Sequence, residues 1–292
     1  MSVEYEVIAD EACRCGEGPI WHVAQGRLYW LDNVTGRLFW YDPKTNHHEL
    51  ALQYDGIAAA TVQLDGSLLL FGRACGVWRW DGGEPTVVVE PTPGESRFND
   101  VAADPKGRVF AGSMPVPDPD NPGKTLRLGT LYRFDPDGSR HEVEHELGCS
   151  NGIGFSPDLT LMYFVDSVTH KIFVYDYNPD TGEIRNRRVF AEVDHAWSPD
   201  GLTVDAEGCV WCAMWNGSRV IRFSPDGEPI RTIMLPTPMA SSVMFGGPGL
   251  DELYITSAGG QDKQKNGQHA GALFRVRPGM HGKPEFLSRL FL

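Results

Sequence analysis

The chain has 292 residues, of which 41% are hydrophobic and 22% are charged, an ordinary composition for a globular protein that can bury a large core. It carries 26 basic and 39 acidic residues, so its formal net charge is −13. A surface this acidic repels phosphate backbones and anionic membranes, so neither nucleic acid nor a membrane is an expected partner.

Targeting and membrane segments are not evident in the sequence. Met1–Val7 lacks the basic and apolar parts of a signal peptide, and no run approaches the roughly 18 apolar residues of a transmembrane helix. The six cysteines are too few for a disulfide scaffold. Cys209 and Cys212 lie three apart in a strand-like run and would face opposite sides, which argues against a zinc pair. We expect a cytoplasmic protein with reduced thiols.

A repeated unit is the main organising feature of the sequence. An aromatic strand that ends in a turn recurs at Gly36–Pro43, Gly76–Gly82, Gly129–Gly138, His170–Asp176, Ser218–Gly227 and Gly271–Pro278. A hairpin of two apolar strands precedes each copy, with its polar turn at Val23–Gly26, Gln63–Gly66, Asp104–Gly107, Ser156–Asp158, Asp205–Gly208 and Gly246–Gly249. Glycine, proline and aspartate at these places supply turn geometry.

Polar outer strands such as His47–Leu52 and Glu183–Phe190 complete the units. Four short antiparallel strands repeated six times predict an all-β fold, a six-bladed β-propeller, as a single domain over residues 1–292. A β-sandwich is the alternative, but it does not predict this repeat. We expect Pro284–Leu292 to be the outer strand of the last blade, with Tyr5–Ile8 sharing that blade and closing the ring.

One segment departs from the repeat. Pro115–Arg127 is rich in proline and aspartate, so we expect a loop rather than a strand. Such a loop can line the site at the rim of a propeller or be a disordered excursion, and the sequence leaves both open.

Polar residues stand just before the inner strand in four of the six units. These residues are Glu17, Asn99, Asn151 and Asp200, whereas the second unit offers only Ala58–Ala60 and the sixth only Ser241–Ser242. Aspartate is a poor strand former, so its place before an apolar run needs a reason. Equivalent positions on different blades converge near the axis of a propeller. Two carboxylates and two carboxamides meeting there would suit a hard divalent cation.

The opposing interpretation is purely structural. Asparagine and aspartate before glycine are common in turns, and each of the four residues taken alone fits that role. Four such residues at one phase of the repeat favour a metal site. The metal can be calcium, zinc or manganese, although an all-oxygen ligand set favours harder ions.

At these residues the sequence resembles the regucalcin/gluconolactonase family of six-bladed propeller lactonases. The matching segments, in family order, are Gly16–Trp21, Arg97–Asp100, Phe110–Met114, Ser150–Ile153, Phe155–Asp158, Pro199–Leu202 and Phe245–Gly247. One region departs from the pattern: some family members carry acidic residues after the Gly-Ser/Thr-Met segment, where this chain has Pro115–Pro117. Substrate identity therefore does not transfer from any one member.

The resemblance implies hydrolysis of small sugar lactones to aldonic acids at one divalent cation, with a small-molecule sugar lactone as the only partner and a monomer or weak oligomer as the state. By motif, the metal ligands would be Glu17, Asn151 and Asp200, and Asp200 would also be the candidate general base. Asn99 would bind metal-bound water or substrate, and Arg97 would hydrogen-bond substrate hydroxyls.

Other functions fit less well. A hydrolase with a serine or cysteine nucleophile is not expected, because His22, His170 and His195 have no evident serine or cysteine partner. A glycosidase using Glu17 and Asp200 would not explain the two carboxamides. A metal phosphotriesterase of the diisopropyl fluorophosphatase kind would share the four-residue set. A propeller that only binds calcium is a third possibility.

Four large side chains are candidates for the wall of a sugar pocket, although such residues more often belong to a blade core. They are Trp21, Met114, Trp197 and Trp215. His195 lies five residues before Asp200 and is expected on the surface, with the site as the alternative.

Overall fold

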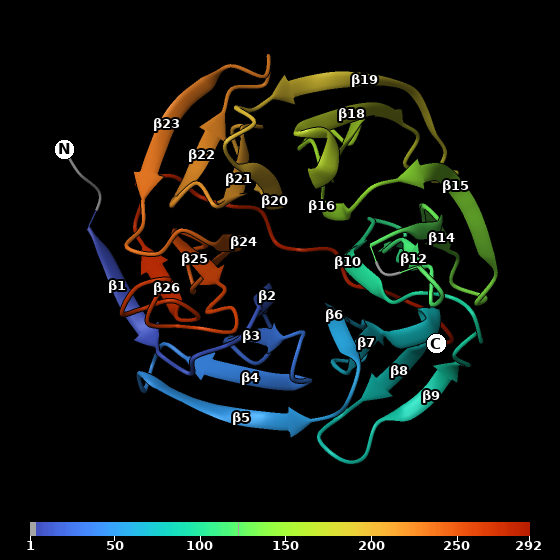
Figure 1. The fold of residues 1–292 in the computed structure, drawn as a ribbon, viewed down its shortest axis with the longest axis horizontal. Helices are drawn as coiled ribbons and strands as arrows, with labels where there is room; N and C mark the ends of the chain where they lie inside the picture. The colour runs from blue at the N-terminus through green and yellow to red at the C-terminus, as the bar shows by residue number, and fades with distance from the viewer. Residues whose placement is uncertain (1–3, 122) are drawn as a thin grey trace.

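The computed structural model describes residues 4–121 and 123–292, so Met1–Val3 and Pro122 of the expected loop lie outside the described residues. Six antiparallel sheets of four strands stand around a central axis (Figure 1), which confirms the predicted six-bladed β-propeller. In that part of the chain, no helix is long and apolar enough to cross a membrane.

Each blade runs from an inner strand at the axis to an outer strand at the rim. The strands, blade by blade, are β2 (Gly16–His22), β3 (Arg27–Asp32), β4 (Arg37–Asp42) and β5 (His47–Gln53); β6 (Ile57–Val62), β7 (Leu68–Gly72), β8 (Val77–Trp80) and β9 (Thr86–Val89); β10 (Phe98–Ala103), β11 (Val109–Ser113), β14 (Gly129–Phe134) and β15 (Arg140–Leu147); β16 (Ser150–Phe155), β17 (Leu161–Asp166), β18 (Lys171–Tyr177) and β19 (Ile184–Glu192); β20 (Ser198–Val204), β21 (Val210–Trp215), β22 (Arg219–Phe223) and β23 (Pro229–Met234); β24 (Ala240–Gly246), β25 (Glu252–Ser257), β26 (Leu273–Val276) and β1 (Tyr5–Ala9). Two single-turn 3-10 helices, η1 (Arg73–Cys75) and η2 (Ser167–Thr169), connect strands of blades two and four.

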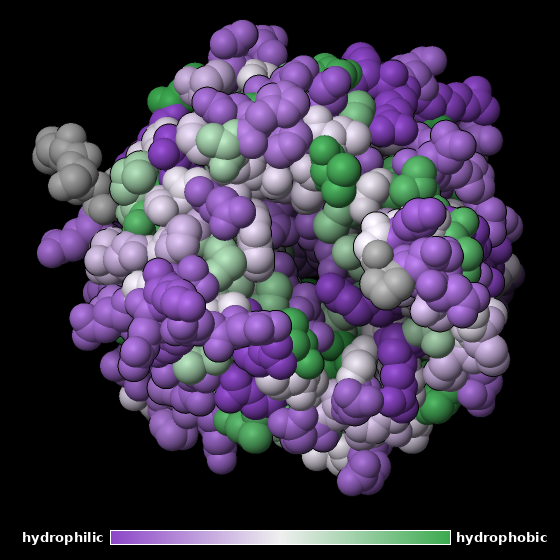
Figure 2. Space-filling model, in the orientation of Figure 1, coloured by the Kyte–Doolittle hydropathy of each residue, from purple (hydrophilic) through white to green (hydrophobic). Residues whose placement is uncertain are grey.

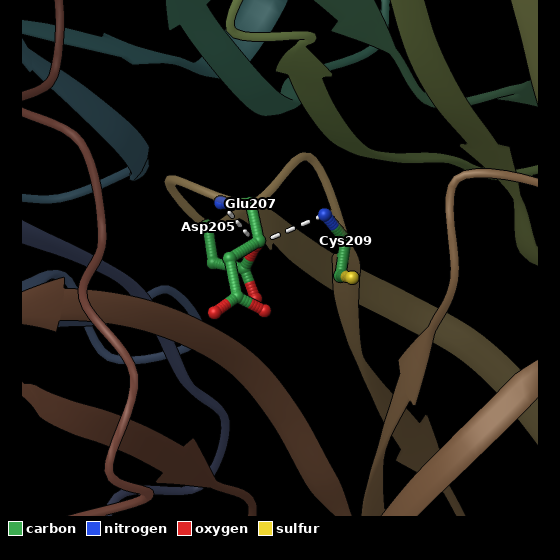
Figure 3. Close-up of side chains that lie close together, drawn as sticks. All are labelled: Asp205, Glu207 and Cys209. Atoms are coloured by element: carbon green, nitrogen blue, oxygen red, sulfur yellow. Dashed lines mark hydrogen bonds between the residues drawn. The ribbon is translucent and has the colours of Figure 1, made fainter.

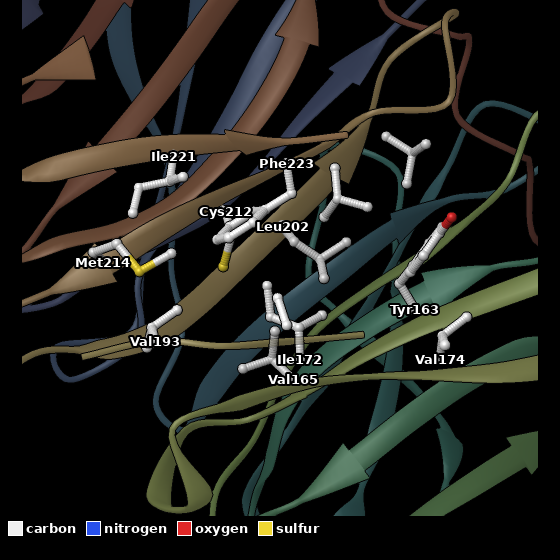
Figure 4. Packing of buried hydrophobic residues seen from close by; sticks show 13 residues of the cluster. Tyr163, Val165, Ile172, Val174, Val193, Leu202, Cys212, Met214, Ile221 and Phe223 are labelled. Carbon is white, nitrogen blue, oxygen red and sulfur yellow. The ribbon is translucent and has the colours of Figure 1, made fainter. Parts of the chain in front are cut away.

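Apolar side chains between neighbouring blades form the core. Between blades four and five, Val165 of β17, Leu202 of β20 and Met214 of β21 belong to one buried cluster (Figure 4). Burying a side chain of this size contributes about 1.5–3 kcal/mol. The inner and middle strands bury both faces in this way and the outer strands do not, which is why the outer strands are the polar ones in the sequence.

The ring closes through the N-terminus. β1 pairs antiparallel with β26, with Tyr5 opposite Val276, so the expectation for Tyr5–Ile8 is confirmed. The expectation for Pro284–Leu292 is wrong, because β1 already occupies the outer edge of the sixth blade and leaves no place for another strand.

The C-terminal segment, residues 283–292, instead crosses the channel at the end opposite the first residues of the inner strands, which we call its lower end. It passes behind the ring in Figure 1. It bonds to three blades on its way: Lys283 Nζ donates to Phe155 O at 2.7 Å, Ser288 N to Val62 O at 2.9 Å and Arg289 N to Gly107 O at 2.9 Å. The segment ties together blades that are far apart in sequence and closes one end of the channel.

The segment Pro115–Arg127 connects β11 to β14. The described residues form a small antiparallel hairpin of β12 (Val116–Pro117) and β13 (Thr125–Arg127) rather than the uniform loop that its proline content predicted. The pairing is only two and three residues long, as expected where prolines remove ladder donors.

A shift of register interrupts every inner strand close to its first residues. The shifts lie at Glu17/Ile20, Ile57/Ala59, Phe98/Asp100, Ser150/Ile153, Pro199/Leu202 and Ala240/Ser242. Extra residues in a strand re-aim the side chains at that point. We call the end of the ring at which the inner strands begin its upper face. Each blade therefore has one position there that can point at the axis.

Candidate metal centre and active site

The four polar residues of the repeat meet in one pocket of about 240 Å³ on the upper face. The face seen in Figure 2 is hollowed at the centre of the ring. The pocket is lined by Glu17, Asn99, Asn151 and Asp200, together with Cys15, Asn33, Arg97, Met114, Cys149, Ser167, Val168, Ser198 and Trp215. The structure thus brings together all five residues predicted from the sequence as ligands or substrate contacts.

Backbone geometry explains how these side chains reach the axis. Asn99, Asn151 and Asp200 lie within the register shifts of their strands, and Glu17 lies at the start of the shift in blade one. The glycine after Asp200 is required by space, because a Cβ on Gly201 would lie 2.0 Å from Ser242 Oγ. The Asp-Gly pair is therefore a point of close approach between inner strands rather than a turn.

The two carboxylates have an unfavourable environment on their own. The Asp200 side chain is buried, with 5% of the residue exposed, and its Oδ1 accepts no hydrogen bond from residues 4–121 or 123–292. Burial raises the pKa of Asp200 well above its usual range, and the nearby Glu17 and Asp100 carboxylates raise it further. Burial also raises the pKa of Glu17 to about 8, with Asp100 adding to the shift.

A positively charged partner would stabilise the Glu17 and Asp200 carboxylates. Neither carboxylate forms a salt bridge within the part of the chain that the structure describes; Arg97 lines the same pocket, but its side chain donates only to Phe98 O, at 3.3 Å. Buried carboxylates are stable when they are paired or coordinate a metal. Two carboxylates with two carboxamide oxygens match the ligands of hard divalent cations. The residues present therefore fit a divalent cation at this place.

The carboxamides are ordered by hydrogen bonds. Asn99 Nδ2 donates to Asn151 Oδ1 and to Ser150 O, both at 2.8 Å, and Asn151 Nδ2 donates to Ser167 Oγ at 2.8 Å. The structure thus connects the site residues of blades three and four directly.

Six of the lining residues were not named as site candidates from the sequence, and most of them occupy a shared position in the repeat. Cys15, Cys149 and Ser198 each stand two positions before a site residue, as Arg97 does before Asn99. Asn33 and Ser167 directly follow the second strands of blades one and four. Met114 takes the same position after β11, and Trp215 takes it as the last residue of β21. Aligning the units at these two phases would have found them.

The expected aromatic wall is only partly present. Met114 and Trp215 line the pocket. Trp21 instead stacks on Tyr254 in the core, with ring centroids 6.4 Å apart. Trp197 packs against the core of blades four and five, and the His195 side chain is 71% exposed, outside the pocket lining. The structural interpretation holds for these last three residues.

A second group of ligand-type side chains lies at the other end of β20. Asp205, Glu207 and Cys209 bring ligand atoms within 4.8 Å of one another (Figure 3). Both carboxylates already share a positively charged partner, because Arg222 donates to Asp205 Oδ2 at 2.8 Å and to Glu207 Oε2 at 2.5 Å.

The backbone N–H groups of Glu207 and Cys209 bond Asp205 Oδ1 at 3.0 and 2.9 Å. Trp211 Nε1 donates to Oδ2 at 2.9 Å. These side chains belong to a hairpin turn whose acceptors are already hydrogen-bonded and paired with the Arg222 guanidinium, so the group is a poor candidate for a metal site.

Comparison with known proteins extends over nearly the whole chain. Residues 15–259 match the family model described as SMP-30/Gluconolactonase/LRE-like region. A pentonolactonase, XacC, of Haloferax volcanii is 42% identical over 293 residues, covering 96% of this chain and 97% of that protein. Regucalcin of Homo sapiens is 31% identical, and the alignment covers 94% of each chain. The crystal structure of a calcium-binding protein, regucalcin from Agrobacterium tumefaciens, matches with a TM-score of 0.89 at 25% identity over 99% of each chain.

Proposed function

The chain belongs to the SMP-30/gluconolactonase/LRE-like family, as its motifs predicted, and on that premise we propose that it hydrolyses small sugar lactones to aldonic acids at one bound divalent cation. The observation that carries the metal requirement is that Asp200 Oδ1 has no hydrogen-bond partner among the described residues. This oxygen is buried beside a second carboxylate, that of Glu17. Such a pair is costly in a protein interior without a cation.

Glu17, Asn151 and Asp200 would hold the cation. A divalent cation bound there supplies Lewis-acid polarisation of the lactone carbonyl. Asp200 is the proposed general base, which accepts a proton from water as the water oxygen bonds to the carbonyl carbon, and then returns that proton to the ring oxygen as the ring C–O bond breaks. A carboxylate has two oxygens, so one can bind the cation while the other accepts the proton.

Two polar side chains of blade three would position the sugar. Arg97 lines the pocket and makes one side-chain hydrogen bond among the described residues, to Phe98 O at 3.3 Å, so its other donors are available for hydroxyls. Both hydrogens of the Asn99 amide are committed to Ser150 and Asn151, which leaves its Oδ1 to accept from water or substrate. Met114 and Trp215 supply apolar surface for the carbon face of a ring.

The test is a lactone panel. Gluconolactone, a pentonolactone and an organophosphate ester are offered to metal-free protein, and acid release is followed before and after addition of Ca²⁺, Mn²⁺ or Zn²⁺. We expect lactone turnover that disappears with chelator and returns with one of these ions. Undiminished turnover in chelator would refute the metal requirement, and a higher kcat/KM for the organophosphate would assign the site to phosphotriester hydrolysis instead.

A further inference from the structure

Ser167 joins two of the proposed ligands through one hydroxyl group. It is the first residue of η2, and its side chain is buried. Its Oγ donates to Pro199 O at 2.6 Å and accepts from Asn151 Nδ2 at 2.8 Å. Pro199 directly precedes Asp200, so the hydroxyl contacts the ligand of blade four and the backbone beside the ligand of blade five.

The direction of these two hydrogen bonds follows from the chemistry of the groups. A backbone carbonyl only accepts, so the single proton of Ser167 is committed to Pro199. The hydroxyl can then only accept from Asn151, which requires the NH₂ end of that amide to face it. The Oδ1 of Asn151 must therefore face the other way, toward Asn99 and the pocket.

The amide of Asn99 in blade three has an orientation that matches that of Asn151. Because Asn151 presents an acceptor, Asn99 must present its NH₂ group, which it does at 2.8 Å. The second hydrogen of that group goes to Ser150 O. The serine proton thus selects the orientation of Asn151, whose two amide ends are nearly identical in shape, while the carbonyl of Ser150 independently holds Asn99 in the orientation that matches it.

At the Nδ2 end of Asn151, the contact besides Ser167 does not select the orientation of the amide. Its Nδ2 lies 3.6 Å from Cys149 Sγ, but a thiol is both a weak donor and a weak acceptor and tolerates either end of the amide. The Cys149 thiol itself lies 3.7 Å from Met114 Sδ. Ser167 is the residue whose chemistry is directional.

Blade one makes the same point by contrast. Asn33 stands where Ser167 stands: its N–H bonds Cys15 O at 3.1 Å, as the N–H of Ser167 bonds Cys149 O at 3.0 Å. Blade one presents the carboxylate Glu17 in place of a carboxamide. The two oxygens of a carboxylate are chemically equivalent, so that ligand needs no orienting neighbour, and no hydrogen bond joins Asn33 to Glu17 among the described residues.

We propose that Ser167 is a positioning residue that sets the amide orientation of Asn151, so that the oxygen of this amide rather than its NH₂ group faces the cation. This inference rests on the proposed function. Partners of this kind change metal affinity by about 10- to 100-fold when they are removed from other metal sites.

The test is a double-mutant cycle read by calorimetric titration of Ca²⁺ or Mn²⁺ into metal-free protein. Ser167→Ala is expected to raise the metal Kd by about 10- to 100-fold while Asn151 is present. In an Asn151→Asp background the same Ser167→Ala change is expected to alter Kd by less than about threefold, because a carboxylate needs no orienting.

Ser257→Ala is the matched control. Ser257 is buried, its Oγ donates to Ala272 O at 2.8 Å and accepts from Gly271 N at 3.1 Å, and it lies in blade six, which contributes nothing to the pocket lining within the described residues. We expect a similar fall in melting temperature for both alanine variants, with Kd unchanged in Ser257→Ala.

The outcomes separate the two proposals. A folded Ser167→Ala variant with the parental Kd, or an equal loss of affinity in both backgrounds, would overturn the positioning role. Failure of the parent protein to bind any divalent cation would instead overturn the proposed function.

Discussion

The two ends of β20 carry buried aspartates with opposite surroundings. Asp205, at the lower end, is matched by Arg222, an indole N–H and two backbone N–H groups. Asp200, at the upper end, has an oxygen with no partner among the described residues, and other carboxylates are its nearest charges. Five residues of a strand separate them by about 16 Å. Unmatched acceptors, rather than a high density of ligand-type side chains, therefore distinguish the proposed cation site from the lower cluster.

Replacing the unmatched carboxylate should have the largest effect. Asp200→Asn removes the proposed base and one ligand charge, so we expect kcat/KM for lactones to fall by roughly 10³-fold. The same change replaces the carboxyl group beside Glu17, which is costly to ionise there, with an amide that does not ionise, so the metal-free variant should melt a few °C higher than the parent at neutral pH. Lactone kinetics and thermal melting in chelator measure the two effects. Full metal-dependent turnover in the variant would contradict the assignment of Asp200.

The equivalent change at the lower end should do the reverse. Asp205→Asn leaves Arg222 buried with only Glu207 as a charged partner, and breaking a buried pair in this way costs about 3–5 kcal/mol. Urea denaturation should show this loss of unfolding free energy, while calorimetry should show an unchanged metal Kd. Loss of metal binding with intact folding would identify the lower end as the cation site.

The pH dependence of stability should report on the carboxyl groups of the upper end. In metal-free protein the pKa of Glu17 is raised to about 8, that of Asp100 to about 6, and that of Asp200 well above its usual range. Between about pH 4 and 8 the folded chain therefore retains protons that the unfolded chain has released, so these groups make stability fall as the pH rises.

Each retained proton changes the unfolding free energy by about 1.4 kcal/mol per pH unit. Asp200→Asn should therefore gain stability relative to the parent as the pH rises from 4 to 8, measured by urea denaturation in chelator. A difference between the two proteins that stays constant with pH would contradict the raised pKa of Asp200.

The smallest effect is expected at the rim of the lower cluster. The Glu207 side chain is 68% exposed, and its bond to Arg222 is therefore largely screened by water. Glu207→Gln should lower the unfolding free energy by less than about 1 kcal/mol, leaving Asp205 to hold the arginine. A loss as large as that of Asp205→Asn would mean that the two carboxylates share the charge equally.

Much of the fold was predictable because it is local. The turn predicted at Asp104–Gly107 lies between β10 and β11, where Gly107 N donates to Asp104 O at 2.9 Å, since a turn is set by neighbouring residues. The C-terminal segment was not predictable in the same way. Its bonds reach Thr61 and Gln63, 227 positions away in the sequence, and a contact over that separation leaves no local pattern.

The site also has a part that the sequence predicts and a part that depends on contacts between blades. The repeat phase alone selected Glu17, Asn99, Asn151 and Asp200, because a ring of equivalent units must bring equivalent positions to its axis. Ser167 shares a repeat position with Asn33, but a serine after a strand is an ordinary connection, so this position does not predict the role of its hydroxyl. Only the tertiary structure places its hydroxyl between an amide of its own blade and a carbonyl of the next, and only there does the direction of one proton matter. The sequence by itself thus determined which side chains gather at the axis, whereas the packing of blade against blade decided which oxygens they present.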